Sequence, residues 1–225
     1  MRVKRPVYAS KMGDSRLLKK DLFGEIRHVI DHDNARIIRD SSVAKTWVRW
    51  LARQLLRREA RILAVLTDVD SVPHLLDLQR DYLSRTYLPG APMQVAKPRD
   101  PRYFAAALRI LRRLHRLGVV HNDLAKEPNL LVLSDGSPGF VDFQIALFMP
   151  RRGRLFRWLA YDDLRHLLKH KRTYYPQGLT QREIAILANP SPPSRIWTRT
   201  VKPVYLFVTR RLLGWADREG ASDRS

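Results

Sequence analysis

The feature that most constrains the fold is a run of alternating polar and apolar segments at residues 121–144. It reads HNDLAKEPN, then LLVL, SDGS, PGFV and DFQ. Residues 130–133 predict a strand, 134–137 a turn, and 138–141 a strand that runs back. Four residues out, four in the turn and four back place Asn129 opposite Asp142. His121 and Asp123 then enter the same end of the hairpin from the loop before it.

This gathering of side chains suits metal-assisted chemistry. Asp142 and Asn129 supply a carboxylate and an amide carbonyl, the kinds of oxygen ligand that Mg²⁺ takes in proteins. Asp123 is a second carboxylate, able to orient or deprotonate an attacking hydroxyl. Lys126 could neutralise a phosphoryl group in transfer. Asp and Asn beside strands often only cap turns, but four polar groups at one hairpin end favour the chemical interpretation.

The remaining pattern predicts an α+β protein. A turn-rich cluster, Asp31 to Asn34, divides short mixed runs that indicate a small antiparallel sheet. The interrupted stretch Pro89-Gly90-Ala91-Pro92 is typical of a linker, which gives a small domain at 1–90 and a larger, mainly helical one at 91–225. Helices are predicted at 43–66, 101–117 (with Asp100 as N-cap), 155–171, 180–188 and 204–216, and short strands within 73–92.

Charge and composition limit the class of partner. The chain has 42 Lys and Arg against 22 Asp and Glu, a net charge of +20, and no cysteine. Disulfides and thiolate metal sites are therefore excluded. Such a charge attracts nucleic acid, anionic membranes or phosphorylated substrates, although a solvated basic surface explains it equally well. The mixed apolar and basic segment 204–215 either packs on the larger domain or lies on an anionic membrane.

The residues at 121–144 resemble the catalytic segment of kinase-like phosphotransferases. His121-Asn122-Asp123-Leu124 is similar to the His-x-Asp-Leu catalytic loop, and Asp142-Phe143-Gln144 to the metal-binding Asp-Phe-Gly. The resemblance covers roughly residues 15–170 and is nearer to atypical bacterial members, the RIO-type and lipopolysaccharide (Kdo/heptose) kinases. It implies a two-lobed protein-kinase-like fold with a reduced N-terminal sheet lobe and a larger, mainly helical C-terminal lobe.

That resemblance also implies roles for individual residues. Asp123 and Lys126 would be catalytic, and Asn129 and Asp142 would hold Mg²⁺. Arg39 stands where the family carries a phosphate-binding Lys, and Glu59 is the only acidic residue between Asp40 and Asp68 that could pair with it. Gly24 is the one glycine of the loop expected to cover the nucleotide. Leu88 lies in the segment where backbone groups would meet the adenine of ATP.

The resulting expectation is an ATP- and Mg²⁺-dependent kinase that phosphorylates a hydroxyl. The acceptor is a protein Ser or Thr or a lipopolysaccharide-type sugar, and the protein is cytoplasmic or peripheral at the inner membrane. The alternative is a pseudokinase or basic scaffold that binds a partner, a membrane or RNA without turnover. His166 and His170 have the spacing of a metal pair, but a solvated basic face is the favoured interpretation of residues 162–172.

Overall fold

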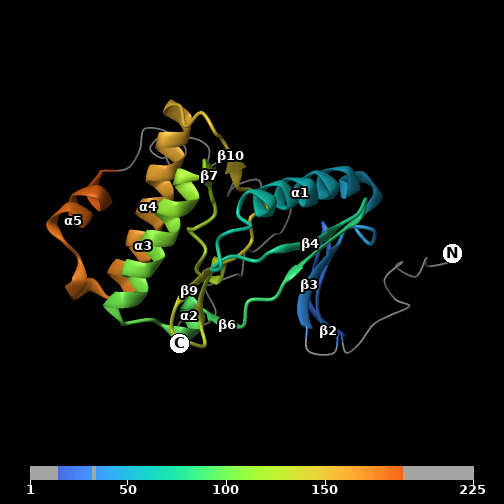
Figure 1. Ribbon diagram of the computed structural model, residues 1–225, viewed down its shortest axis with the longest axis horizontal. Coiled ribbons are helices and arrows are strands. Elements are labelled where there is room, and N and C mark those ends of the chain that lie inside the picture. The colour runs from blue at the N-terminus through green and yellow to red at the C-terminus, as the bar shows by residue number, and fades with distance from the viewer. Residues whose placement is uncertain (1–14, 32–33, 190–225) are drawn as a thin grey trace, which may run out of the picture. The chain divides into compact units, whose positions relative to one another are not determined.

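The computed structural model describes residues 15–31 and 34–189, and these form two compact units (Figure 1). The first unit comprises residues 15–89 together with the short segment 142–146. The second comprises residues 90–141 and 147–189. The helix predicted at 204–216 lies outside the described residues. In the described part of the chain, no helix is both long enough and apolar enough to cross a membrane.

The first unit is built on a five-stranded antiparallel sheet with the strand order β1-β2-β3-β5-β4. Strands β1 to β3 form a meander, and β5 pairs with the open edge of β3. The strands are β1 (Ser15–Asp21), β2 (Gly24–Asp31), β3 (Asn34–Asp40), β4 (Leu75–Leu78) and β5 (Tyr82–Thr86).

Helix α1 (Thr46–Val65) packs against β4 and β5 of this sheet. Its apolar residues recur at helical spacing, so that Leu56 and Ala60 are buried against Leu83 of β5. The N-terminal half packs Val48 and Ala52 into a second cluster. The burial of this stripe fixes which side chains of α1 face the sheet, and Glu59 lies among them.

Gly24 begins β2 at a place where only glycine fits. Its φ is +136°, and a Cβ added there would lie 2.0 Å from the carbonyl oxygen of Asp40. The tight β1–β2 connection pairs Asp21 with Gly24, so that the backbone passes directly over the end of β3. Glycine is thus required here by the packing of the sheet itself.

The second unit combines helices with short strands. Helix α3 begins after Asp100, whose side chain accepts a hydrogen bond from the backbone N–H of Arg102, and α3 packs against α4 (Figure 1). Its helices are α2 (Met93–Ala96), α3 (Pro101–Arg116), α4 (Arg154–Tyr174), α5 (Gln181–Ala188) and the 3₁₀ turns η2 (Glu127–Asn129) and η3 (Pro176–Gly178). Its strands are β6 (Gly90–Pro92), β7 (Val119–Val120), β8 (Leu130–Leu133), β9 (Pro138–Phe140) and β10 (Leu147–Phe148).

The predicted linker at residues 89–92 is largely a strand. β6 pairs with β8, with Gly90 opposite Leu133 and Pro92 opposite Leu131. A Cβ on Gly90 would lie 2.8 Å from the carbonyl oxygen of Val132, so glycine permits this close approach. Proline suits this strand because β6 is at the edge of the sheet order β6-β8-β9.

The β8–β9 hairpin forms as predicted, but its register differs by one residue. Leu130 pairs with Phe140, and the backbone N–H of Val141 donates to the carbonyl oxygen of Asn129 at 3.0 Å. Asn129 is therefore opposite Val141, not Asp142. The reason is the turn, in which Gly136 adopts a φ of +80° and Leu133 already bonds to Ser137. A three-residue loop closes the hairpin where four residues were predicted.

Candidate active site

In the first unit, a buried charge cluster connects β3, α1, β5 and the segment 142–146. Arg39 Nε lies 3.6 Å from Glu59 Oε2, and Arg39 Nη2 lies 3.5 Å from Asp142 Oδ1. Arg85 Nε lies 3.3 Å from Glu59 Oε1. The Glu59 side chain is fully buried, and both guanidinium groups are at least nine-tenths buried. Two cations and two anions thus balance one another, and of the four side chains only that of Asp142 is substantially exposed to solvent.

The geometry of this cluster follows from sheet register. Arg39 is opposite Leu83, and Arg85 is opposite Ile37, so the two arginines are diagonal neighbours on one face of the sheet. Leu83 on that face packs against α1, which brings Glu59 between the guanidinium groups. The pKa of Arg85 is lowered, chiefly by burial of its guanidinium group. The Glu59 carboxylate raises this pKa, and the positive charge of Arg39 lowers it further.

Asp142 has a left-handed backbone, with φ of +65°. A non-glycine residue in this region is uncommon and tends to occur where a side chain must be aimed for function. Its carboxylate is about one-third exposed while that of Glu59 is fully buried. Of the two carboxylates that contact Arg39, Asp142 is therefore the one that a ligand from solvent can reach.

In the second unit, the loop 121–129 brings three predicted residues together. The amide nitrogen of Asn129 donates to Asp123 Oδ2 and to the Asp123 carbonyl oxygen, each at 2.9 Å. Lys126 Nζ lies 3.1 Å from Asp123 Oδ2 and is about half exposed. The 3₁₀ turn η2, with Pro128 inside it, returns the chain so that Asn129 reaches Asp123 across six positions.

Asp163 of α4 holds the start of this loop. Its carboxylate accepts hydrogen bonds from the backbone N–H groups of His121 at 2.7 Å and Asn122 at 2.8 Å, and it lies 3.3 Å from His115 Nε2. The residue is 1% exposed. Asn122 has a φ of +63°, so this carboxylate stabilises an unfavourable turn just before Asp123. His121 itself is buried and braces the loop, with Nε2 3.0 Å from the Val141 carbonyl oxygen.

The prediction of a solvated basic face for residues 162–172 is wrong. His170 Nε2 lies 2.7 Å from the carbonyl oxygen of Leu124, and Lys171 Nζ binds Glu183 of α5 at 2.8 Å. Arg165 donates to the carbonyl oxygens of Ile186 and Leu187 at the end of α5. Burial, aided by the charge of Lys169, lowers the pKa of His166 to about 4. The polar residues of α4 therefore join it to the loop 121–129 and to α5.

Two members of these clusters were not predicted. Arg85 could have been found from strand alternation, because it shares a face with the buried Leu83 and a buried arginine requires an acidic partner such as Glu59. Asp163 gave no comparable signal, since it bonds to residues 41 and 42 positions away in sequence. Within the described ranges, no cluster of three or more His, Asp or Glu suited to hold a metal occurs in either unit.

Replacement of Asp163 by Asn should loosen the loop selectively. The buried N–H groups of His121 and Asn122 lose a charged acceptor, which should lower the free energy of unfolding by about 2–3 kcal/mol. Hydrogen exchange at these two amides should accelerate more than exchange elsewhere in the second unit. Asp162→Asn is the matched control, because Asp162 is more exposed than Asp163 and its ion pair with Arg165 is long, at 3.8 Å. Equal exchange at the two amides in wild type and Asp163→Asn would contradict the positioning role.

The fold is similar to solved kinase structures. A crystal structure of the Rio2 kinase from Chaetomium thermophilum matches with a TM-score of 0.60 and 15% sequence identity, covering 81% of this chain and 60% of that one. The structure of its ADP/Mg²⁺-phosphoaspartate complex matches with a TM-score of 0.58 and 15% identity, covering 81% and 59%. This chain thus spans about 60% of the length of those proteins.

No family model and no curated protein matches the sequence. At 15% identity the structural likeness defines the fold, and the predicted fold class is confirmed: an α+β, protein-kinase-like fold with an antiparallel sheet in its N-terminal part and a mainly helical C-terminal part.

Proposed function

We propose that this protein is an ATP- and Mg²⁺-dependent phosphotransferase that moves the γ-phosphoryl group to a hydroxyl. The observation that carries the proposal is the contact of one buried arginine, Arg39, with both Glu59 and Asp142. The kinase fold of the structural neighbours supports it, as does the ADP and Mg²⁺ in one of them.

In the first unit, Arg39 would bind the phosphates of the nucleotide. A guanidinium group can donate two parallel hydrogen bonds to a phosphate. Glu59 holds Arg39 in place through their ion pair. Glu59 also pairs with Arg85, so its negative charge offsets the repulsion between the two arginines. We assign the turn at Gly24 to the cover of the nucleotide, and the backbone of Leu88, just after β5, to contact with adenine.

Asp142 and Asn129 fit a magnesium ion by the chemistry of their donor atoms. The Asn129 amide nitrogen is engaged by Asp123, which leaves its amide oxygen as the atom for a metal. The exposed share of the Asp142 carboxylate likewise suits a ligand that arrives with nucleotide. Once bound, Mg²⁺ would neutralise charge that develops on the phosphates.

The acceptor hydroxyl would be oriented by Asp123, which would also take its proton. Lys126, whose Nζ lies 3.1 Å from Asp123 Oδ2, would bring a positive charge beside the transferred phosphoryl group. Asp163 and Asn129 fix the loop from either end, so that the carboxylate is positioned before substrate arrives. Such pre-organisation is the main contribution a protein makes to phosphoryl transfer.

The test is transfer from γ-labelled ATP in the presence of Mg²⁺, measured as ADP release and autophosphorylation. Asp142→Asn should lower the rate at least about 100-fold, because a neutral amide binds Mg²⁺ far more weakly than a carboxylate. Asp70→Asn, an exposed residue of the same unit, should leave it unchanged. The proposal fails if wild type neither binds Mg-ATP nor turns it over with any acceptor.

The proposed acceptor is a protein Ser or Thr or a lipopolysaccharide-type sugar, as in the atypical bacterial kinases that the sequence resembles. We propose the two functional domains to be residues 1–90 and 91–225. The dependence on ATP supports a cytoplasmic location, and the net charge of +20 supports a peripheral position at the inner membrane.

A second candidate is a scaffold that binds an anionic membrane without turnover. The outward face of α1 carries Trp47 and Trp50, which are 73% and 69% exposed, followed on the same face by exposed Arg57, Arg58 and Arg61. Aromatic and basic residues on one helix suit a lipid headgroup region. Sedimentation with phosphatidylserine vesicles would favour this candidate if binding persisted while Mg-ATP turnover was absent. RNA binding predicts instead an affinity for RNA that falls steeply with salt.

A further inference from the structure

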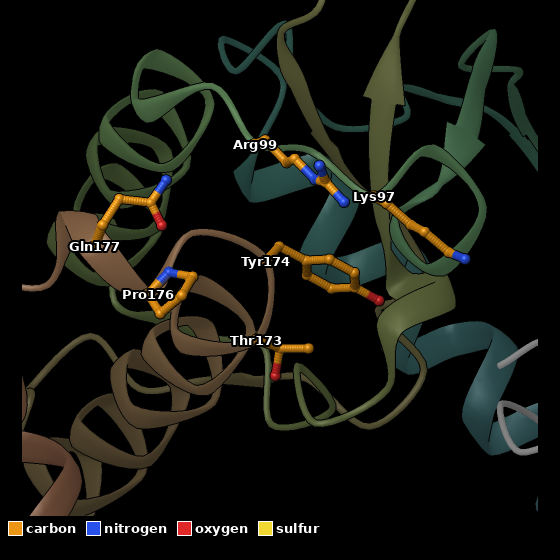
Figure 2. A pocket seen from close by; sticks show the side chains of 6 residues that line it. All are labelled: Lys97, Arg99, Thr173, Tyr174, Pro176 and Gln177. Atoms are coloured by element: carbon orange, nitrogen blue, oxygen red, sulfur yellow. The ribbon is translucent and has the colours of Figure 1, made fainter.

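The second unit contains a pocket that none of the assigned residues line. Its volume is about 300 Å³, and its lining comes from the segment after α2 and from the end of α4 with η3. In the view of Figure 2, the Tyr174 ring lies at the centre of the lining side chains. The lining residues are Lys97, Arg99, Thr173, Tyr174, Pro176 and Gln177.

Both walls of this pocket are attached to the catalytic loop. On one side, α2 packs against η2, which contains Asn129, and Lys97 directly ends α2. On the other side, His170 of α4 contacts the Leu124 carbonyl oxygen at 2.7 Å, and Tyr174 follows one helical turn later on the same face. The elements on both sides of the pocket thus also contact the loop that carries Asp123.

The chemistry of the lining selects an anion. Lys97 and Arg99 supply two exposed cations, while Thr173, Tyr174 and Gln177 carry hydroxyl and amide groups. Within residues 15–31 and 34–189, no carboxylate lines the pocket, and the neighbouring Asp100 is already paired with Arg102 at 2.9 Å. The lining that the structure describes is therefore positively charged.

Lys97 also has a strained backbone. It adopts φ of +47° and ψ of +60°, the left-handed region that a residue with a side chain rarely occupies. Its backbone N–H closes α2 by bonding to the Met93 carbonyl oxygen at 2.8 Å. Glycine would serve this helix end with less strain, so the turn itself gives no reason for a lysine at this position.

We propose that this pocket binds the phosphorylated sugar portion of the acceptor. The volume lies at the lower end of the range for small-molecule sites, which suits one sugar ring with its phosphate. The cations would bind the phosphate, and the hydroxyl and amide groups would bind the ring. The inference rests on the proposed phosphotransfer and names the class of acceptor, a hydroxyl on an already phosphorylated sugar.

The test is a titration of the whole chain with glucose 6-phosphate in the absence of nucleotide. Binding is monitored through the NMR chemical shifts of the backbone amides. We expect saturable shifts at Lys97, Arg99 and Gln177, with weaker binding of inorganic phosphate and none of glucose. The Lys97→Glu/Arg99→Glu variant should raise the Kd at least tenfold. The matched control is Arg109→Glu/Arg112→Glu, which makes the same change of charge at exposed positions of α3 and should bind normally.

The inference is overturned if glucose 6-phosphate causes no shifts in wild type, or binds the Lys97→Glu/Arg99→Glu variant as tightly. Tighter binding of inorganic phosphate or of a phosphoserine peptide would overturn the assignment to a sugar. Mg-ATP turnover without sugar phosphate binding refutes this inference alone. Sugar phosphate binding without any Mg-ATP turnover refutes the proposed phosphotransfer and leaves only a sugar phosphate site.

Discussion

Asp123→Asn should lower the rate of phosphoryl transfer by about 10²–10⁴-fold, the usual contribution of a general base. Asn can still accept the hydrogen bond from the Asn129 amide that the carboxylate accepts at 2.9 Å, so the loop should keep its shape. It cannot take a proton, and it removes the negative charge that pairs with Lys126. The expected result is a large loss in kcat with the affinity for Mg-ATP within about threefold of wild type.

Two measurements separate this chemical effect from damage to the fold. Single-turnover transfer from γ-labelled ATP gives the chemical step, and equilibrium titration with Mg-ADP gives nucleotide affinity. Asp135→Asn is a suitable control, because Asp135 is exposed in the β8–β9 turn, and an asparagine there can still accept from the Ser137 N–H. Transfer by Asp123→Asn at the wild-type rate would show that Asp123 is not the base.

Glu59→Gln should strongly destabilise the first unit. It removes the only carboxylate that Arg85 contacts at ion-pair distance among the described residues and one of the two that Arg39 contacts. Removal of one partner of a buried pair typically costs about 3–5 kcal/mol, because the remaining charge stays buried without compensation. Urea denaturation of the purified protein measures this change as a lower midpoint at constant slope.

A second variant tests the physical reason. In Glu59→Gln/Arg85→Gln the uncompensated cation is also removed, so the double variant should be more stable than additivity predicts, by about 1–3 kcal/mol. Glu25→Gln is the comparison: this carboxylate is also buried, but its partners Lys20 and Arg27 reach solvent, so its loss should cost less than the loss of Glu59. Strict additivity in the Glu59 and Arg85 pair would contradict the coupling inferred from the structure.

Local signals predicted the helices well. The predicted helix at 43–66 is α1 (Thr46–Val65), and that at 101–117 is α3 (Pro101–Arg116), because an apolar stripe, and for α3 also the N-cap Asp100, act within a few residues. Longer-range features were missed. The one-residue error in the hairpin arose at Gly136, whose left-handed conformation shortens the turn. The predicted linker contains strand β6 instead. Local sequence did not indicate this strand, because its partner, β8, lies about 40 residues away in sequence.

The candidate site was predictable where a residue type was unusual for its place. Arg39 and Glu59 were chosen through the resemblance to kinase-like phosphotransferases, and Glu59 was singled out because it is the only acidic residue between Asp40 and Asp68. Asp163 could not be chosen, since it lies in a dense run of charges and its partners are backbone N–H groups of a distant loop. Hydrogen bonds from a side chain to a remote backbone leave no trace in residue spacing.

The membership of residues 142–146 in the first unit has a consequence for synthesis of the chain. The ribosome completes β1 to β5 and α1 by residue 86, yet Asp142, the second carboxylate on Arg39, is made more than 50 residues later. Until then Arg39 has only Glu59. The small unit is therefore translated first, but its set of charges is completed only after α2, α3 and strands β6 to β9 of the second unit have been made.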